Sequence, residues 1–358
     1  MRFGKWTKLH QLLHDNHGVR YFVMAIGFAV ATGLSVLTWM WMQPEPQLPT
    51  TYVTKTTKPP AKKIYSPLTG LEVSDEAATT RQVTAVMIEN SPDARPQSGL
   101  KDAGIVYETI AEGGITRFVA LYQESRPGLI GPVRSVRPYY VEWAAAYDPA
   151  VAHIGGSARA LEMIRSGSYG VDIDQFFNAG GYWRASDRAA PHNVYTDFDH
   201  LDQLTSSKGK TSSTFTPIPR KDDQKSKTPT ATTITVPISS GNYEVGYTYD
   251  SATNSYLRSL AGEAHIDREG GRITPKVAVV IVVPMVVAME DGYREQITTT
   301  GSGSGYIFQD GIVTEVTWQK ADAKSQITFT DAAGKQVSLN RGQTWITAIP
   351  EGKTPSWQ

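Results

Sequence analysis

The segment 21–42 constrains this chain more than any other, because its 22 residues carry no charged side chain. That length is about what a helix needs to cross the hydrocarbon core of a bilayer. Trp39 and Trp41 lie at its far end, where membrane helices often carry interfacial aromatic side chains. Four basic residues precede the segment, and the next one after it is Lys55. The positive-inside rule then predicts a single-pass anchor in the cytoplasmic membrane, with residues 1–20 as a cytoplasmic tail and the bulk of the chain on the outer side.

Two other interpretations of this segment compete with the anchor. A cleavable signal peptide is disfavoured because the apolar run is long and no small-x-small cleavage site follows it. A buried helix of a soluble protein is disfavoured because no face of the helix would be polar. Residues 43–64 are rich in Pro, Thr and Lys, a composition that predicts an extended tether beyond the membrane.

Three further regions differ in their composition and in their pattern of apolar residues. Residues 65–204 alternate β-rich runs with helical patterns, which predicts a mixed α/β domain. Residues 205–232 are polar throughout and predict a linker or a long mobile loop. Residues 233–350 consist of strand-like runs separated by turns, which predicts a mostly antiparallel β domain. The predicted fold class is therefore α+β behind an N-terminal transmembrane helix.

Individual elements can be placed within these regions. Strands are expected at 83–90, 105–114, 117–123 and 151–154, and helices at 139–148 and 158–167. The apolar run 277–287 is short and contains a proline, so a buried strand is expected there rather than a membrane span. The glycine-rich stretch 301–305 precedes a strand and is expected to form a flexible hairpin turn rather than a phosphate-binding loop.

The composition excludes several classes of function. The chain has 35 basic and 35 acidic residues, so no bulk positive field points to nucleic acid. It has no cysteine, which excludes disulfides, thiolate zinc sites, cysteine nucleophiles and a lipid on cysteine. No P-loop, GxGxxG or GxSxG motif is present, and the histidines beyond the N-terminal tail lack HxH or HxxxH spacing. Neither a cofactor nor a metal is therefore expected.

Arginines are the most suggestive polar residues of the first domain. Arg134 and Arg137 lie three positions apart, and two guanidinium groups can hold a carboxylate or a phosphate. The alternative is internal pairing with nearby carboxylates, namely Glu108, Glu112 or Asp187. The predicted ligand-binding set also includes Arg117, Arg184, Arg188 and Asn193. We expect at least three of the five arginines to line one pocket, with His153 or His192 at its edge.

The stretch His153–Ser157 reads as a strand end, a glycine turn and a helix start. Free amides of Gly155, Gly156 and Ser157 at a helix N-terminus would favour an anion, so these three join the predicted ligand-binding set. The alternative is an ordinary tight turn in which Ser157 is a common N-cap.

Three residues are candidates for acid–base catalysis, namely Glu112, His153 and His192. The alternative for both histidines is a structural, hydrogen-bonded role. Glu89 or Glu108 would also serve as a general acid if buried. Glu108 and Glu112 are an even number of positions apart on one strand, so their side chains are expected on the same face. In the β domain a turn gathers three polar residues that a surface loop would also explain, namely Arg258, His265 and Asp267.

Several motifs together resemble a known family. PLTG, VMIENSPDARPQSGL, IVYETIAEGGITRFVALY, IGPVRSVRPYYVEWA, HIGGS and YWRASDRAAPHNVY resemble the N-terminal domain of the YerB-like family of bacterial envelope proteins. YDSATNSYLRSLAGEAHID and GQTWITAIP resemble its C-terminal domain, so the resemblance covers roughly residues 65–350. Typical members are similar to lipoproteins with a lipid-bearing cysteine, whereas this chain has an apolar segment and no cysteine. The polar positions that match the family pattern are Glu112, Arg117, Arg134, Arg137, His153, Arg184, His192 and Asn193.

The resemblance implies an envelope protein and a domain of unknown function, without a reaction. Two functional hypotheses remain. In the first, an Arg/His-lined cleft binds an anionic ligand such as a cell-wall fragment or polymer. In the second, the protein is a wall-active hydrolase or transferase that uses Glu112, His153 or His192 as acid or base. Binding is preferred because no nucleophile motif or metal-ligand set is present; the sequence leaves protein partners open.

Overall fold

The computed structural model describes residue 10 and residues 14–44, 63–287 and 292–358. The chain forms two compact units, Met1–Ala61 and Lys62–Gln358. In the first unit, helix α2 (His17–Trp41) is long and apolar enough to cross a membrane, and none of its residues is buried. The expected N-terminal apolar helix is thus confirmed. Almost all of the predicted tether, 43–64, lies outside the described residues.

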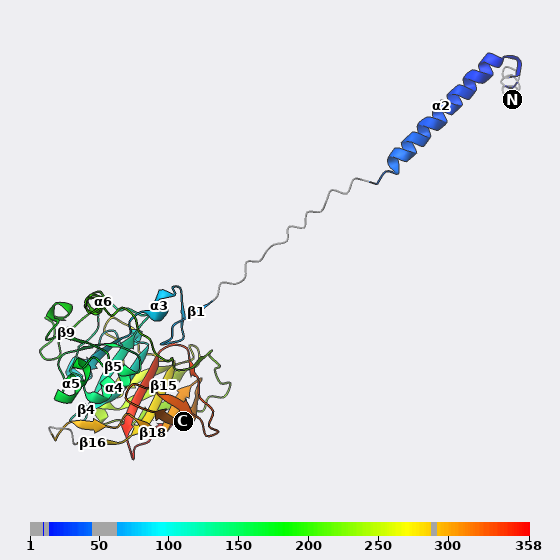
Figure 1. The fold of residues 1–358 in the computed structure, drawn as a ribbon. Helices are drawn as coiled ribbons and strands as arrows, with labels where there is room; N and C mark the ends of the chain where they lie inside the picture. The colour runs from blue at the N-terminus through cyan, green and yellow to red at the C-terminus, as the bar shows by residue number, and fades with distance from the viewer. Residues whose placement is uncertain (1–9, 11–13, 45–62, 288–291) are drawn as a thin grey trace. The chain divides into compact units, whose positions relative to one another are not determined.

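A ten-stranded sheet runs through the second unit and combines strands from both of its ends (Figure 1). Strand β22 is the link, because it pairs in parallel both with β15 and with β4, which precedes it by more than 200 positions. The order is β20 (Thr328–Thr330), β19 (Ile312–Lys320), β18 (Gly301–Gln309), β15 (Val277–Val283), β22 (Thr344–Pro350), β4 (Ile105–Glu112), β5 (Ile115–Tyr122), β3 (Thr84–Glu89), β6 (Ala150–His153) and β7 (Val171–Asp174).

Smaller sheets and short helices surround this sheet. A five-stranded sheet has the order β14 (Glu263–Ala264), β13 (Ser255–Leu260), β12 (Val245–Asp250), β11 (Thr233–Val236) and β23 (Ser356–Trp357). Two-stranded pairs are β1 (Ile64–Tyr65) with β2 (Glu72–Val73), β8 (Trp183–Arg184) with β9 (Val194–Tyr195), β10 (Arg220–Lys221) with β21 (Leu339–Asn340), and β16 (Met285–Val287) with β17 (Glu295–Ile297). The helices of this unit are α3 (Ala77–Thr80), α4 (Pro138–Ala145), α5 (Ala158–Arg165) and α6 (Phe198–Ser207).

Strand alternation explains how the sheet is buried on both faces. In β3, Met87 packs in one apolar cluster with residues of α4 and α5, whereas Ile88 packs in a second cluster with residues of α6. Successive strand residues point to opposite faces, so a strand covered on both sides is apolar at every position. In β15, Val279 joins the first cluster, and Val280 joins a third cluster with the five-stranded sheet. Helices therefore cover one end of the large sheet, and a second sheet covers the other.

The predicted α+β class is confirmed, as are the strands β3, β4 and β5 and the helices α4 and α5. The run 277–287 begins with the buried strand β15, as expected. The expectation of a flexible turn at 301–305 is wrong, because these residues belong to β18 and pair with β19. A side chain at Gly303 would come within 2.7 Å of Trp318 Nε1, so glycine permits the close approach of this tryptophan.

The polar segment 205–232 is a loop that packs along the second unit. Its residues Ile218 and Ala231 are buried, and its short strand β10 pairs in parallel with β21. Arg220 donates hydrogen bonds to Thr344 Oγ1 at 2.8 Å and to the Leu68 carbonyl at 2.6 Å. The segment therefore ties together residues from both halves of the chain. The division into domains 65–204 and 233–350 stays a prediction.

Candidate functional site

The candidate site lies where strands β3, β4 and β6 end, at one edge of the large sheet. These strands run in the same direction, and their last residues are Glu89, Glu112 and His153. In α/β sheets ligands commonly bind outside the carboxyl ends of such strands. The segment that leads to α4 crosses this edge and brings in Arg134 and Arg137. We use the name carboxyl edge for Glu89, Glu112, Arg117, Arg134, Arg137 and His192.

Glu112 is held by two buried arginines. Arg117 Nη2 donates to its Oε1 at 2.8 Å, and Arg137 donates to its Oε2 from Nη2 at 2.6 Å and from Nε at 3.0 Å. Arg117 Nη1 also donates to the Ser135 carbonyl at 3.0 Å. Burial alone would raise the pKa of Glu112, but the two guanidinium groups outweigh it and hold the pKa below its ordinary value. Glu112 is therefore an ionised partner of arginines rather than a poised acid.

The prediction that Glu108 and Glu112 share a face is wrong. A β-bulge between Ile110 and Glu112 shifts the register, so that Glu108 lies opposite Phe118 and Glu112 lies opposite Ile115. Phe118 and Ile115 are an odd number of positions apart, so they point to opposite faces of β5. The bulge directs Glu112 toward Arg117 and leaves Glu108 in the interior.

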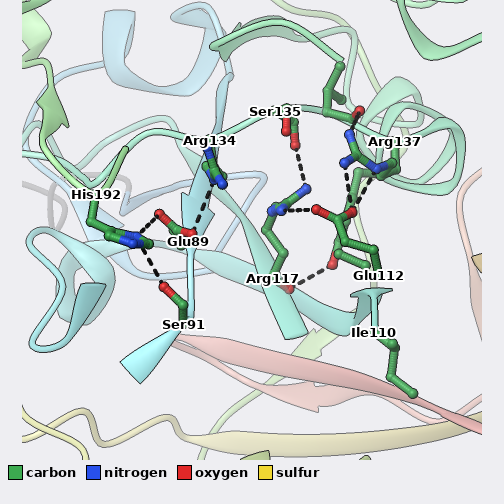
Figure 2. Close-up of polar contacts among 12 residues, drawn as sticks. Glu89, Ser91, Ile110, Glu112, Arg117, Arg134, Ser135, Arg137 and His192 are labelled. Carbon is green, nitrogen blue, oxygen red and sulfur yellow. Dashed lines mark hydrogen bonds and ion pairs between the residues drawn. The ribbon is translucent and has the colours of Figure 1, made fainter. Parts of the chain in front are cut away.

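Glu89 binds an arginine and a histidine at its two carboxylate oxygens. Arg134 Nε donates to Oε1 at 3.1 Å, and His192 Nδ1 donates to Oε2 at 2.9 Å (Figure 2). Ser91 Oγ also lies 3.2 Å from His192 Nδ1. Both contacts use the same ring nitrogen, whereas a Ser–His–acid relay uses both. His192 Nε2 makes no hydrogen bond within the part of the chain that the structure describes.

Arg134 and Glu89 differ sharply in exposure. The carboxylate side chain is 4% exposed, and the arginine side chain is 27% exposed. Among the described residues, the Arg134 guanidinium makes only its bond to Glu89, so its two terminal nitrogens are available to a ligand. Arg134 thus presents its positive charge at the surface of the edge, while Glu89 fixes its orientation from below.

His153 is fully buried and both of its ring nitrogens are engaged. Nδ1 lies 2.9 Å from the Gly155 carbonyl, and Nε2 lies 3.0 Å from Asp172 Oδ1. The burial of Asp172 opposes ionisation, but its bond to His153 and the nearby positive charges lower its pKa overall. His153 thus joins β6 to β7 and has no ring nitrogen free for a substrate.

Backbone amides of the glycine turn after His153 also form hydrogen bonds within the protein. The Gly155 amide donates to Asp174 Oδ1 at 3.1 Å, and the Ser157 amide donates to the Val136 carbonyl at 3.3 Å. Gly155 has a φ of +63°, which favours glycine, and a side chain at Gly156 would collide with Val136. Ser157 is the N-cap residue of α5, as expected, although its side chain makes no capping bond. Two of the amides predicted to bind an anion thus already have partners.

The remaining predicted residues lie on the segment 183–193. Asn193 accepts from Arg184 Nη1 at 2.7 Å, and Arg188 Nη2 donates to the Pro96 carbonyl at 2.7 Å. Arg184 is exposed and Arg188 is half-buried. The structure therefore gathers Arg117, Arg134 and Arg137 at the carboxyl edge and leaves the other two arginines on this segment.

A cavity of about 650 Å³ opens beside the carboxyl edge, but it is lined by none of the five arginines and by neither candidate histidine. Pro138 and Tyr139, which follow Arg137 directly, contribute to its wall. Arg117, Arg134 and Arg137 lie together at the carboxyl edge. That at least three of the five arginines line one pocket stays a prediction.

Sequence reasoning missed some residues and misplaced others. Ser91 beside His192 carries no motif that would have identified it. The interpretation of Arg258, His265 and Asp267 as part of a surface loop is wrong, because all three residues are buried. Arg258 Nη2 donates to Glu108 at 2.7 Å, and this partner lies 150 positions earlier in the chain. Such a pairing has no local sequence pattern.

Comparisons with known proteins agree with this structure. Residues 68–211 match the N-terminal domain, and residues 234–346 the C-terminal domain, of a protein family of unknown function, DUF3048. The putative lipoprotein YerB of Bacillus subtilis is 33% identical over 294 residues, which are 81% of this chain and 88% of that protein. The crystal structure of B. subtilis YerB superposes with a TM-score of 0.74 at 32% identity and covers 82% of this chain and all of that one. This chain therefore belongs to the DUF3048 family of YerB-like proteins.

Proposed function

We propose that this protein is anchored in the bacterial cytoplasmic membrane by α2 and that its unit Lys62–Gln358 lies on the outer side. The apolar length of α2 and the basic residues before it support this orientation. The name of the B. subtilis relative, a putative lipoprotein, supports a place in the cell envelope. Lipid and transmembrane helix are two means to the same attachment.

We further propose that the carboxyl edge binds an anionic group of a cell-wall polymer or fragment. The observation that carries this proposal is Arg134, whose half-buried guanidinium is oriented by Glu89 and has both terminal nitrogens available. A guanidinium with two parallel donors suits a carboxylate or a phosphate.

The charge balance of the edge supports the same ligand class. Three arginines face two carboxylates, so the edge has one positive charge in excess. Arg117 and Arg137 share the single carboxylate of Glu112, so the excess charge arises at this cluster, while Glu89 balances Arg134. Both guanidinium groups at Glu112 are buried, so Arg134 is the arginine through which a ligand meets the positive edge. Because this charge is local, it acts within a protein of zero formal net charge.

One observation favours the alternative of a wall-active hydrolase or transferase. The Glu89 carboxylate accepts from His192 Nδ1, a contact that leaves Nε2 as the lone-pair nitrogen of the neutral ring. In that alternative His192 is the base and Glu89 its positioning residue. Glu112 and His153 do not converge with it, because each is bound to other partners.

Co-sedimentation of the full chain in detergent with purified cell-wall sacculi tests these proposals. Anion binding predicts that the protein pellets with intact sacculi, that added salt releases it, and that sacculi stripped of anionic polymer retain less of it. Equal pelleting with stripped sacculi would contradict the ligand class. Release of soluble wall fragments by the wild type, but not by His192→Gln, would favour the hydrolase alternative.

A further inference from the structure

The cavity beside the carboxyl edge is lined by a different set of residues. Its wall is formed by the first turns of α4 and α5 and by the segment 295–300, which begins with β17. The backbone of Arg294 forms an isolated antiparallel β-bridge with Glu112, a residue of the carboxyl edge. The next residue, Glu295, already lines the cavity. The two surfaces are neighbours and share no residue.

The charge of this cavity is opposite to that of the edge. Three carboxylates line it, from Glu142, Glu162 and Glu295, against the single guanidinium of Arg159. Within the described ranges, no group of three carboxylate or imidazole side chains is arranged to hold a metal ion. The excess negative charge therefore suits an organic cation that meets the carboxylates at separate points.

Glu295 is the residue that points to a ligand. It is 8% exposed, and no described residue forms a hydrogen bond or an ion pair with its side chain. Glu142, by comparison, accepts a hydrogen bond from Thr299 Oγ1. Burial raises the pKa of Glu295, and nothing opposes that effect. A largely buried carboxylate without a partner is costly, and Glu295 lines the cavity, where a ligand can supply that partner.

We propose that this cavity binds the primary ammonium group of an aliphatic amine, with Glu295 as its principal partner. An ammonium group has three donors that rotate freely, so it can donate to Glu295 without requiring one fixed approach angle. Pro138 and Ile297 in the wall provide apolar contact for an aliphatic stem of the lysine type. This site does not depend on the anionic ligand of the carboxyl edge.

Binding of small probes to the full chain in detergent tests the site. The probes are Nα-acetyl-lysine methylamide, its norleucine counterpart without the ammonium group, and its arginine counterpart, each titrated by ligand-observed NMR. We expect the lysine probe to bind and the other two to bind at least about tenfold more weakly, the scale of one charge-assisted hydrogen bond. Equal affinity of the lysine and norleucine probes would overturn the proposal, and equal affinity of the arginine probe would overturn its restriction to primary ammonium.

Variants then assign the site to Glu295. Glu295→Gln should weaken the lysine probe by about tenfold, whereas Glu263→Gln, at an exposed glutamate of β14, should leave it unchanged. Because the unpartnered carboxylate is costly, Glu295→Gln should not lower the unfolding midpoint of the protein. Unchanged affinity, or a large fall in the midpoint, would show that Glu295 has a structural role instead. Arg134→Ala should leave the lysine probe unaffected, which separates this site from the carboxyl edge.

Discussion

Glu108 and Arg258 form an ion pair in which neither side chain has any exposed surface, although 150 positions separate them in the chain. The carboxylate also accepts from Trp345 Nε1 at 2.9 Å, and the Arg258 guanidinium lies 4.2 Å from the Trp345 ring centroid. His265 contacts Arg258 and places Nε2 3.0 Å from Gln97 Oε1. This buried polar network joins the first half of the second unit to the last.

Removal of one partner of this pair should destabilise the protein strongly. Glu108→Gln leaves the Arg258 charge buried without its counter-ion, which typically costs about 3–5 kcal/mol. Urea unfolding followed by tryptophan fluorescence measures this change. The matched control is Glu72→Gln, which breaks the exposed pair with Lys63 and should leave the stability nearly unchanged. Equal effects of the two substitutions would contradict the role of the network.

His265 should make stability fall as the pH drops below its ordinary pKa of 6.5. Burial, reinforced by the charges of Arg258 and Arg95, holds the pKa of the folded-state imidazole well below that value. Below pH 6.5 the imidazole therefore binds a proton in the unfolded chain but not in the folded chain. The free energy of unfolding then decreases by up to about 1.4 kcal/mol for each pH unit. His265→Gln cannot titrate, so its stability should depend less on pH between 6.5 and 5. An unchanged slope would show that the imidazole is protonated in the fold.

The two halves of the second unit should not separate into stable fragments. The polar segment 205–232 predicts two independent domains, but the parallel pairing of β22 with both β4 and β15 makes one sheet of both halves. A protease site introduced at 222–228 should yield two pieces that co-elute in gel filtration until denaturant is added. Two separately folded fragments after cleavage would show that the pairing is dispensable.

The orientation in the membrane can be tested with protease on intact spheroplasts of a bacterium that expresses the chain. The basic residues before 21–42 predict that everything beyond about residue 45 is degraded, while an N-terminal tag is spared. Detergent should expose the tag and serves as the control. Protection of the unit Lys62–Gln358 in intact spheroplasts would reverse the orientation.

Local patterns predicted much of the fold. Continuous β-rich runs identified β3, β4 and β5, and Pro138 and Ser157 marked the starts of α4 and α5. The glycine-rich part of β18 was mistaken for a turn, because its close packing against Trp318 depends on a neighbouring strand. Sequence alone cannot reveal which strand lies beside a glycine.

The candidate site was predictable in its residues but less so in its partners. Arg117, Arg134 and Arg137 do gather at one edge, because a strand and the segment before α4 bring them there. The bulge that turns Glu112 toward them, and the engagement of both His153 nitrogens, arise from tertiary contacts. The burial of Glu108 and Arg258 was likewise not predictable from local sequence, because the two residues pair across 150 positions.

The most direct test of anion binding is calorimetric titration of the full chain in detergent with a soluble anionic wall fragment, comparing wild type, Arg134→Ala and Arg341→Ala. Arg341 is the matched control, because its side chain is 28% exposed and its Nε also bonds a carboxylate, that of Asp222, at 2.9 Å. We predict that Arg134→Ala weakens binding by about 1–3 kcal/mol, the scale of a lost charged hydrogen bond, with little change in the unfolding midpoint. Arg341→Ala should bind as the wild type does. Unchanged affinity of Arg134→Ala together with a large loss of stability would contradict the account, because Arg134 would then serve only to neutralise Glu89.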